Sequence, residues 1–292
     1  MMKKFPDCSI NNINYQSKLF VCPIPILCIE PEKKTNNSVI FIFNCGLGGT
    51  NKWNEFMCFP IFQENYFISY EKASHGNNKN KPSQYRKKTL IELQEVILFV
   101  RNKYPNRKIY LLGESWGSSI NFLYLKQYGH KYVDGVVNWN MPYKPKNVEK
   151  LPFFKKLSIT CKIIFTWLFN IGLNDKQSNF VHDKLSQNVF LVRAKKIAGT
   201  QSMNTKLPIC SWRFMKPSWR FLFKNLSNNT YNFLYIQTGQ DILAKKKIVD
   251  KLNTNYKSSK KYLFIPSGFH VLTFEPKEST ILYSEIKKFI SK

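Results

Sequence analysis

Three residues of the types that together perform nucleophilic catalysis occur in this chain in a fixed order, each a few residues after an apolar run. Residues 113–117 read Gly-Glu-Ser-Trp-Gly, and Asp241 and His270 each follow a later apolar run. A serine hydroxyl is a weak nucleophile until a base takes its proton, and a carboxylate can orient that base. The order therefore predicts Ser115 as the nucleophile, His270 as its general base and Asp241 as the residue that orients the imidazole.

The residues around Ser115 fit a strand that turns tightly into a helix. Residues 108–112 form a short apolar run typical of a buried strand, and residues 116–128 have the character of a helix. In this G-x-S-x-G turn, Gly113 and Gly117 must lack side chains because the turn is so tight. The serine then lies at a helix N-terminus, where free N–H groups favour developing negative charge.

A tetrahedral intermediate on Ser115 also needs two N–H donors for its oxyanion. The backbone N–H of Trp116, directly after the nucleophile, is one expected donor. The other should come from the loop that follows the apolar strand 39–43, where residues 44–49 read Asn-Cys-Gly-Leu-Gly-Gly.

Taken together, these motifs resemble the α/β-hydrolase superfamily, and most closely its monoacylglycerol lipase, lysophospholipase and serine aminopeptidase group. Residues 45–48, Cys-Gly-Leu-Gly, are similar to the group's His-Gly-x-Gly oxyanion loop except at the first position. The resemblance implies the Leu47 N–H as the second oxyanion donor. Residues 74–76 resemble the group's Gly-His-Gly, in which His75 is expected to tie loops together rather than to catalyse, and residues 270–275 resemble its C-terminal signature.

The fold that this resemblance implies is the α/β-hydrolase fold, of class α/β, with a mostly parallel sheet and helices on both faces. The resemblance covers roughly residues 36–142 and 230–292. Strand-like and helical segments alternate along the chain, which independently favours a parallel sheet. The expected strands are 38–43, 66–70, 108–112, 133–139, one from about 232 and one at 261–265, and the expected helices are 51–63, 84–103, 116–128 and 242–252.

A long segment separates the sixth expected strand from the seventh. We expect residues 1–143 and 230–292 to form the hydrolase core and residues 144–229 to form a helical cap inserted after strand six. Aromatic residues are dense in this segment. Each one can simply pack the cap onto the sheet, but as a group they favour an apolar pocket for an acyl chain.

The N-terminal residues 1–35 are expected to contribute a first strand or hairpin. Pro23 and Pro25 interrupt the apolar run 21–28. Because proline cannot donate a hydrogen bond to a ladder, they predict that this run is an edge strand.

Cysteine usage and the N-terminal residues point to a reducing compartment. The seven cysteines include no C-x-x-C pair, which favours free thiols. Residues 1–4 begin like a signal peptide, but no apolar stretch follows. We therefore expect a cytoplasmic protein.

The formal net charge of +27 is high, but only six of the 45 basic residues are Arg. Because Arg is the residue that binds phosphate and base edges in a bidentate way, this composition disfavours specific nucleic-acid binding. A Lys-rich chain is still attracted to anionic surfaces, including lipid head groups. The segment 153–173, with Lys155, Lys156 and Lys162 beside bulky apolar residues, fits either a lid that lies in a membrane interface or a fixed cap.

The favoured function is a serine esterase or lipase that cleaves lipid or medium-chain esters, without cofactor or metal, since no histidine pair has metal-ligand spacing. A proline-releasing aminopeptidase is the alternative, but a free ammonium needs carboxylates, and residues 144–229 offer only Glu149, Asp175 and Asp183. A thioesterase and a catalytically inactive binding module remain open. Asp250 is the rival acid, within an expected helix that Asp241 could cap.

Overall fold

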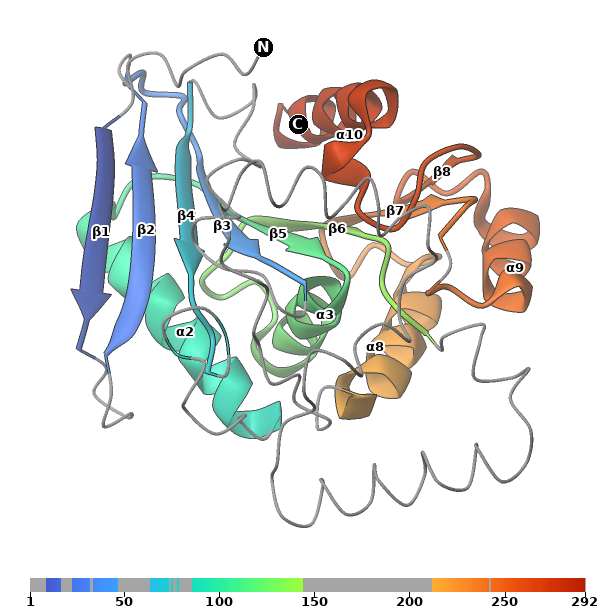
Figure 1. Ribbon diagram of the computed structural model, residues 1–292, viewed down its shortest axis with the longest axis horizontal. Coiled ribbons are helices and arrows are strands. Elements are labelled where there is room, and N and C mark those ends of the chain that lie inside the picture. Colours follow the sequence, from blue (N-terminus) through green and yellow to red (C-terminus); the bar gives the residue numbers. More distant parts are fainter. Residues whose placement is uncertain are drawn as a thin grey trace, which may run out of the picture.

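An eight-stranded sheet runs through the computed structural model, which describes residues 9–16, 23–31, 34–46, 64–73, 75, 78, 86–143, 212–241 and 243–291. The strand order across the sheet is β1-β2-β4-β3-β5-β6-β7-β8 (Figure 1). The strands are β1 (Ser9–Tyr15), β2 (Ile24–Glu30), β3 (Ile40–Asn44), β4 (Tyr66–Tyr70), β5 (Ile109–Glu114), β6 (Gly135–Trp139), β7 (Phe233–Thr238) and β8 (Tyr262–Ile265). The helices are α2 (Arg86–Lys103), α3 (Trp116–Tyr128), α8 (Trp212–Asn225), α9 (Lys246–Tyr256) and α10 (Pro276–Ile290), with a short 3₁₀ turn, η3 (Leu272–Phe274).

The strands from β4 to β8 run parallel to one another, and among the described strands only β2 runs against them. β2 pairs antiparallel with both β1 and β4, whereas each neighbouring pair from β4–β3 to β7–β8 is parallel. Because the carboxyl ends of parallel strands meet at one edge, the loops after β3, β5, β6, β7 and β8 gather there. The mostly parallel α/β sheet expected from the sequence is confirmed.

Alternate side chains of the strands fill two separate cores. On β3, Ile40 and Ile42 belong to the core that α2, α3 and α8 cover, and Phe41 and Phe43 belong to the core on the face of α10 (Figure 1). Burial on both faces explains why these strands are continuous apolar runs rather than alternating ones.

None of the described helices is long and apolar enough to cross a membrane.

The described end of the expected cap segment packs as part of the helical layer. Helix α8 lies against α3, where Phe214 meets Trp116 edge-on at 5.3 Å between ring centroids and Ser218 Oγ donates to the carbonyl of Ser119 at 3.0 Å. Residues 144–211 of the expected cap lie outside the described residues, and so does the helix expected at 51–63.

The prediction that the proline-containing run is an edge strand is wrong. Strand β2 has β1 on its outer side, in register from Tyr15 opposite Ile24 to Ser9 opposite Glu30. Pro25 is only the second residue of β2, so most of the ladder lies beyond it. The sequence analysis did not predict the bounds of the outer strand, because four of its seven residues are Ser or Asn and it lacks an apolar run. Of the two alternatives expected for residues 1–35, a first strand or a hairpin, the structure has the antiparallel pair β1 and β2.

Candidate active site

Ser115 occupies a strained turn between β5 and α3. Its backbone angles are φ 55° and ψ −119°, a conformation that costs free energy for any residue with a side chain. Hydrogen bonds to β6 hold the turn. The Ser115 N–H donates to the carbonyl of Trp139 at 3.0 Å, and the Ser118 hydroxyl donates to the carbonyls of Gly113 and Trp139 at 2.7 and 2.8 Å.

Both glycines of the turn stand where no side chain fits. A Cβ on Gly117 would lie 1.8 Å from the carbonyl oxygen of Asn44. A Cβ on Gly113 would lie 2.3 Å from Asn138 Oδ1 and 2.9 Å from the backbone of Ser118. The close passage of backbone that the sequence pattern predicted is therefore present at both positions.

We expect Gly117→Ala to destabilise the fold by about 3 kcal/mol or more, because a methyl group that overlaps rigid backbone forces β3 and α3 apart. Denaturant unfolding would measure the loss. Ser119→Ala, on the same helix, is the matched control, since its buried hydroxyl has no hydrogen-bond partner within the described residues. Equal stability of the two variants would show that the turn can open without cost.

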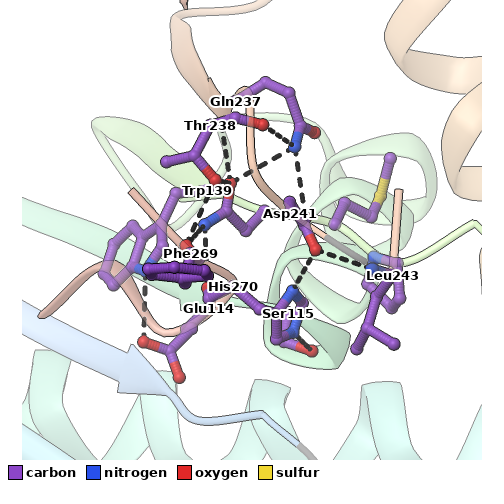
Figure 2. A network of polar contacts seen from close by, with 12 residues as sticks. Glu114, Ser115, Trp139, Gln237, Thr238, Asp241, Leu243, Phe269 and His270 are labelled. Carbon is purple, nitrogen blue, oxygen red and sulfur yellow. Dashed lines mark hydrogen bonds and ion pairs between the residues drawn. The ribbon is translucent and has the colours of Figure 1, made fainter. Parts of the chain in front are cut away.

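The structure brings Ser115, His270 and Asp241 into one hydrogen-bonded line. His270 Nε2 lies 2.7 Å from Ser115 Oγ, and His270 Nδ1 lies 2.8 Å from Asp241 Oδ1 (Figure 2). The three side chains come from the loops after β5, β7 and β8, at the carboxyl edge of the sheet. All three are buried, with exposed fractions of 8%, 5% and 1% for Ser115, His270 and Asp241. The line can pass a proton from the hydroxyl to the imidazole.

Both oxygens of Asp241 accept further hydrogen bonds that fix the carboxylate. Oδ1 accepts from the backbone N–H of Leu243 at 2.8 Å, and Oδ2 accepts from Gln237 Nε2 at 3.1 Å (Figure 2). Capping is not its role, since Lys245 stands at the N-cap of α9. The rival acid, Asp250, lies within α9 and is exposed. Of the two acids, only Asp241 reaches the histidine.

The surroundings of His270 favour its protonated form. Burial alone would lower the pKa of His270, but the charge and hydrogen bond of Asp241, together with the charge of Glu114, raise it above the usual 6.5. An imidazole with a raised pKa is a stronger base toward the serine proton.

Asn140, which the sequence reasoning missed, joins the segments that carry Asp241 and His270. Its Nδ2 donates to the carbonyls of Phe269 and His270 at 3.0 and 2.8 Å, and its Oδ1 accepts from the backbone N–H of Thr238 at 2.9 Å. Its φ of 49° is unusual for a residue other than glycine. The signal was a polar residue just beyond the apolar strand β6, at the edge where sites form in parallel sheets.

A second group that the sequence did not reveal is a buried polar chain beneath the turn. Tyr70 OH donates to Asn44 Oδ1 at 2.6 Å, Asn44 Nδ2 donates to Asn121 Oδ1 at 2.6 Å, and Asn121 Nδ2 donates to Asn138 Oδ1 at 2.9 Å. These bonds connect β4, β3, α3 and β6, and Asn121 and Asn138 lie beside Gly113 of the turn that carries Ser115. A buried polar network of this kind rigidifies the residues that it joins.

The structure describes one of the two expected oxyanion donors, and for the other it describes only a neighbouring residue. Trp116 is the first residue of α3, so its N–H has no acceptor within the helix. Leu47 lies outside the described residues, but its neighbour Gly46 lies beside Ser115, and a Cβ built on Gly46 would be 3.1 Å from Ser115 Cβ. The buried Lys72 holds this loop, since its Nζ donates to the Cys45 carbonyl at 3.1 Å.

His75 is fully buried against the site but is not placed to act as a base. Its ring stacks on Trp116 at 5.5 Å between centroids, and its Nδ1 lies 3.0 Å from the carbonyl of Ala73. Burial, helped by the charge of Lys72, lowers the pKa of His75 to about 3. A neutral, stacked ring supports the loop, as expected from the sequence. Among the described residues no group of three or more His, Cys, Asp or Glu side chains could hold a metal ion.

Comparison with known proteins adds a family model and a set of similar folds. The family model described as "Serine aminopeptidase, S33" matches residues 73–277, more than half of the chain. No curated protein sequence gives a significant match.

Solved structures of similar fold include a highly thermostable carboxyl esterase from Bacillus coagulans, at 15% identity and a TM-score of 0.69, covering 97% of this chain and 98% of that one. A soluble variant of monoglyceride lipase from Saccharomyces cerevisiae has 14% identity and a TM-score of 0.71, with coverage of 97% and 95%. A monoacylglycerol lipase from Paleococcus ferrophilus has 15% identity and a TM-score of 0.62, with coverage of 86% and 94%. At such identities the similarity establishes the α/β-hydrolase fold.

Proposed function

Because the chain belongs to the serine aminopeptidase S33 family of α/β-hydrolase serine hydrolases, we propose that it hydrolyses carboxylic esters with lipid or medium-chain acyl groups. The observation that carries the proposal is the hydrogen-bonded line from Ser115 through His270 to Asp241 at the carboxyl edge of the sheet. Proteins of similar fold include a carboxyl esterase and two monoglyceride lipases, which supports an ester as substrate.

In the first half of the proposed reaction, Ser115 becomes acylated. Its Oγ attacks the ester carbonyl carbon while His270 Nε2 takes the hydroxyl proton, and Asp241 stabilises the imidazolium that forms. The carbonyl oxygen becomes an oxyanion, which the N–H groups of Trp116 and Leu47 would bind. When the tetrahedral intermediate collapses, His270 returns the proton to the departing alcohol, and the acyl group stays on Ser115.

In the second half, water repeats the sequence. His270 takes a proton from the water as it attacks the acyl-enzyme carbonyl, the same donors bind the second oxyanion, and His270 then protonates Ser115 Oγ. The carboxylic acid leaves and the resting enzyme returns. The strained turn and the bonds of Asn140 keep the reacting atoms in place through both halves.

An ester is favoured over a peptide N-terminus by the charge of the chain. Recognising an ammonium group requires nearby carboxylates, and residues 144–229 contain only three acidic residues among many lysines. Aminopeptidase activity nevertheless gives the family model its description, so it is the second function to test. A thioester would react through the same groups.

A fluorophosphonate probe and a substrate panel test the proposal. We expect the probe to label Ser115, as read by mass spectrometry of the labelled peptide. Among p-nitrophenyl esters of increasing chain length, acyl thioesters and aminoacyl anilides, esters of medium or long chain should give the highest kcat/KM. Absence of labelling would favour an inactive binding module, and preference for the anilides would assign an aminopeptidase.

The ester activity should be lost as pH falls. Only the neutral imidazole of His270 can accept the serine proton, so kcat/KM rises as pH increases through the pKa of His270 and is lost below it. Because that pKa is raised above 6.5, the acid limb should lie above 6.5. Initial rates from about pH 5 to 9, with circular dichroism to confirm the fold at each pH, check this. A flat profile with chemistry rate-limiting would contradict a histidine base.

A further inference from the structure

Glu114 is a buried carboxylate directly before the nucleophile, and the reaction described above does not use it. It is the last residue of β5 and is 5% exposed. Its Oε2 accepts hydrogen bonds from Trp139 Nε1 and from Thr273 Oγ1, both at 3.2 Å (Figure 2 shows the contact with Trp139). Burying a carboxylate is costly, so a chain that places one here needs a reason for it.

The two hydrogen bonds of Glu114 connect β5 to the segment that carries His270 and to β6. Thr273 lies in η3, three residues after His270, and Trp139 ends β6. Asn140 holds the same segment from the other side through the carbonyls of Phe269 and His270. The backbone that carries the imidazole is therefore held by Glu114 and by Asn140.

Glu114 and His270 also interact through their charges. Burial raises the pKa of Glu114 to about 7, against the opposing charge of His270 and the hydrogen bonds from Trp139 and Thr273. In return, the Glu114 charge helps to raise the pKa of His270. Each group thus favours the charged form of the other, as linkage requires.

We propose that Glu114 is a positioning residue that acts through His270: its carboxylate holds the histidine segment by way of Thr273, and its charge stabilises the imidazolium that forms when Ser115 is deprotonated. This inference rests on the proposed function for its catalytic consequence. The coupling between the two side chains is a property of the resting protein and does not depend on that function.

Other ionisable groups near His270 differ in position. Asp241 hydrogen-bonds the imidazole directly. Glu278 of α10 is buried beside Gly268, two residues before the histidine. Lys72 contacts Cys45 and lies over the ring of Trp116. Among the described residues, Asp241 and Glu114 are the two whose charges raise the pKa of His270, so removing Glu114 leaves one of these two carboxylates to support the imidazolium.

The test compares Glu114→Gln with Thr273→Val. Glutamine can accept the same two hydrogen bonds but carries no charge, whereas the valine variant keeps the charge and loses one bond. The chain has four histidines, and the signal of His270 is identified as the one that His270→Ala removes. NMR titration of that imidazole signal should give a lower pKa for His270 in Glu114→Gln than in the wild type. Its kcat/KM on a p-nitrophenyl ester should fall about tenfold at the plateau, and its acid limb should move to lower pH. Thr273→Val should keep the acid limb of the wild type.

A purely structural Glu114 would leave the His270 pKa unchanged in Glu114→Gln, and that result overturns the proposal. If the wild-type protein hydrolyses no ester but Glu114→Gln still lowers the pKa of His270, the proposed function alone is overturned. If Glu114→Gln does not fold, the coupling is tested from the other side, by comparing the titration of Glu114 in the wild type and in His270→Ala. The carboxyl carbon signal of Glu114 should titrate at higher pH in His270→Ala than in wild type, because a positive neighbour has been removed. An unchanged titration would again refute the coupling.

Discussion

Ester hydrolysis should be abolished in Ser115→Ala, with a loss in kcat on the order of 10⁴-fold or more. The loss is large because the hydroxyl oxygen is the atom that bonds to the substrate, so without it His270 and Asp241 have no proton to move. Removing one member of such a line costs nearly as much as removing all of it. The variant should fold, since alanine removes only the hydrogen bond between Ser115 Oγ and His270 Nε2 among those of the described residues.

The measurement is kcat on the preferred p-nitrophenyl ester, together with fluorophosphonate labelling and a thermal unfolding curve. Ser119→Ala, one turn along α3, is the matched control and should retain wild-type activity because its hydroxyl has no hydrogen-bond partner among the described residues. If Ser115→Ala kept activity near that of the control, the nucleophile would lie elsewhere in the chain.

Local sequence patterns were enough to predict most of the fold and the three candidate catalytic residues that the structure brings together. The turn could be predicted because Gly-x-Ser-x-Gly leaves few backbone solutions, and Gly117 proved to face the Asn44 carbonyl directly. Asp241 and His270 could be predicted because each comes a few residues after a mainly apolar run, and such runs form the inner strands of a parallel sheet. The ends of those strands then determine where the two side chains meet.

The supporting residues could not be predicted because their roles depend on contacts between distant segments. Asn140 and Phe269 are 129 positions apart, and Glu114 and Thr273 are 159 apart. Nothing in the sequence near Asn140 indicates the carbonyls that it holds. The bounds of the outer strand β1 could not be predicted for a different reason: its residues are largely polar, and it forms by pairing with the edge of β2.

Asp241→Asn should reduce kcat/KM about 10⁴-fold, while Asp250→Asn should leave it close to wild type. The asparagine side chain is nearly the same size, so packing is preserved, but its amide carries no charge to stabilise the imidazolium. Its NH₂ group can also donate to His270 Nδ1, which would place the proton on Nε2 and leave no lone pair there to accept the serine proton.

The hydrogen bonds around Asp241 make this substitution especially unfavourable. Both carboxylate oxygens accept from N–H donors, Leu243 on one side and Gln237 on the other. An amide nitrogen in either place therefore faces a donor, and the site loses a hydrogen bond as well as a charge. Kinetics on the preferred ester above the acid limb, with circular dichroism to confirm folding, would measure both variants. A larger loss in Asp250→Asn than in Asp241→Asn would show that the exposed acid on α9 supports the histidine during the reaction.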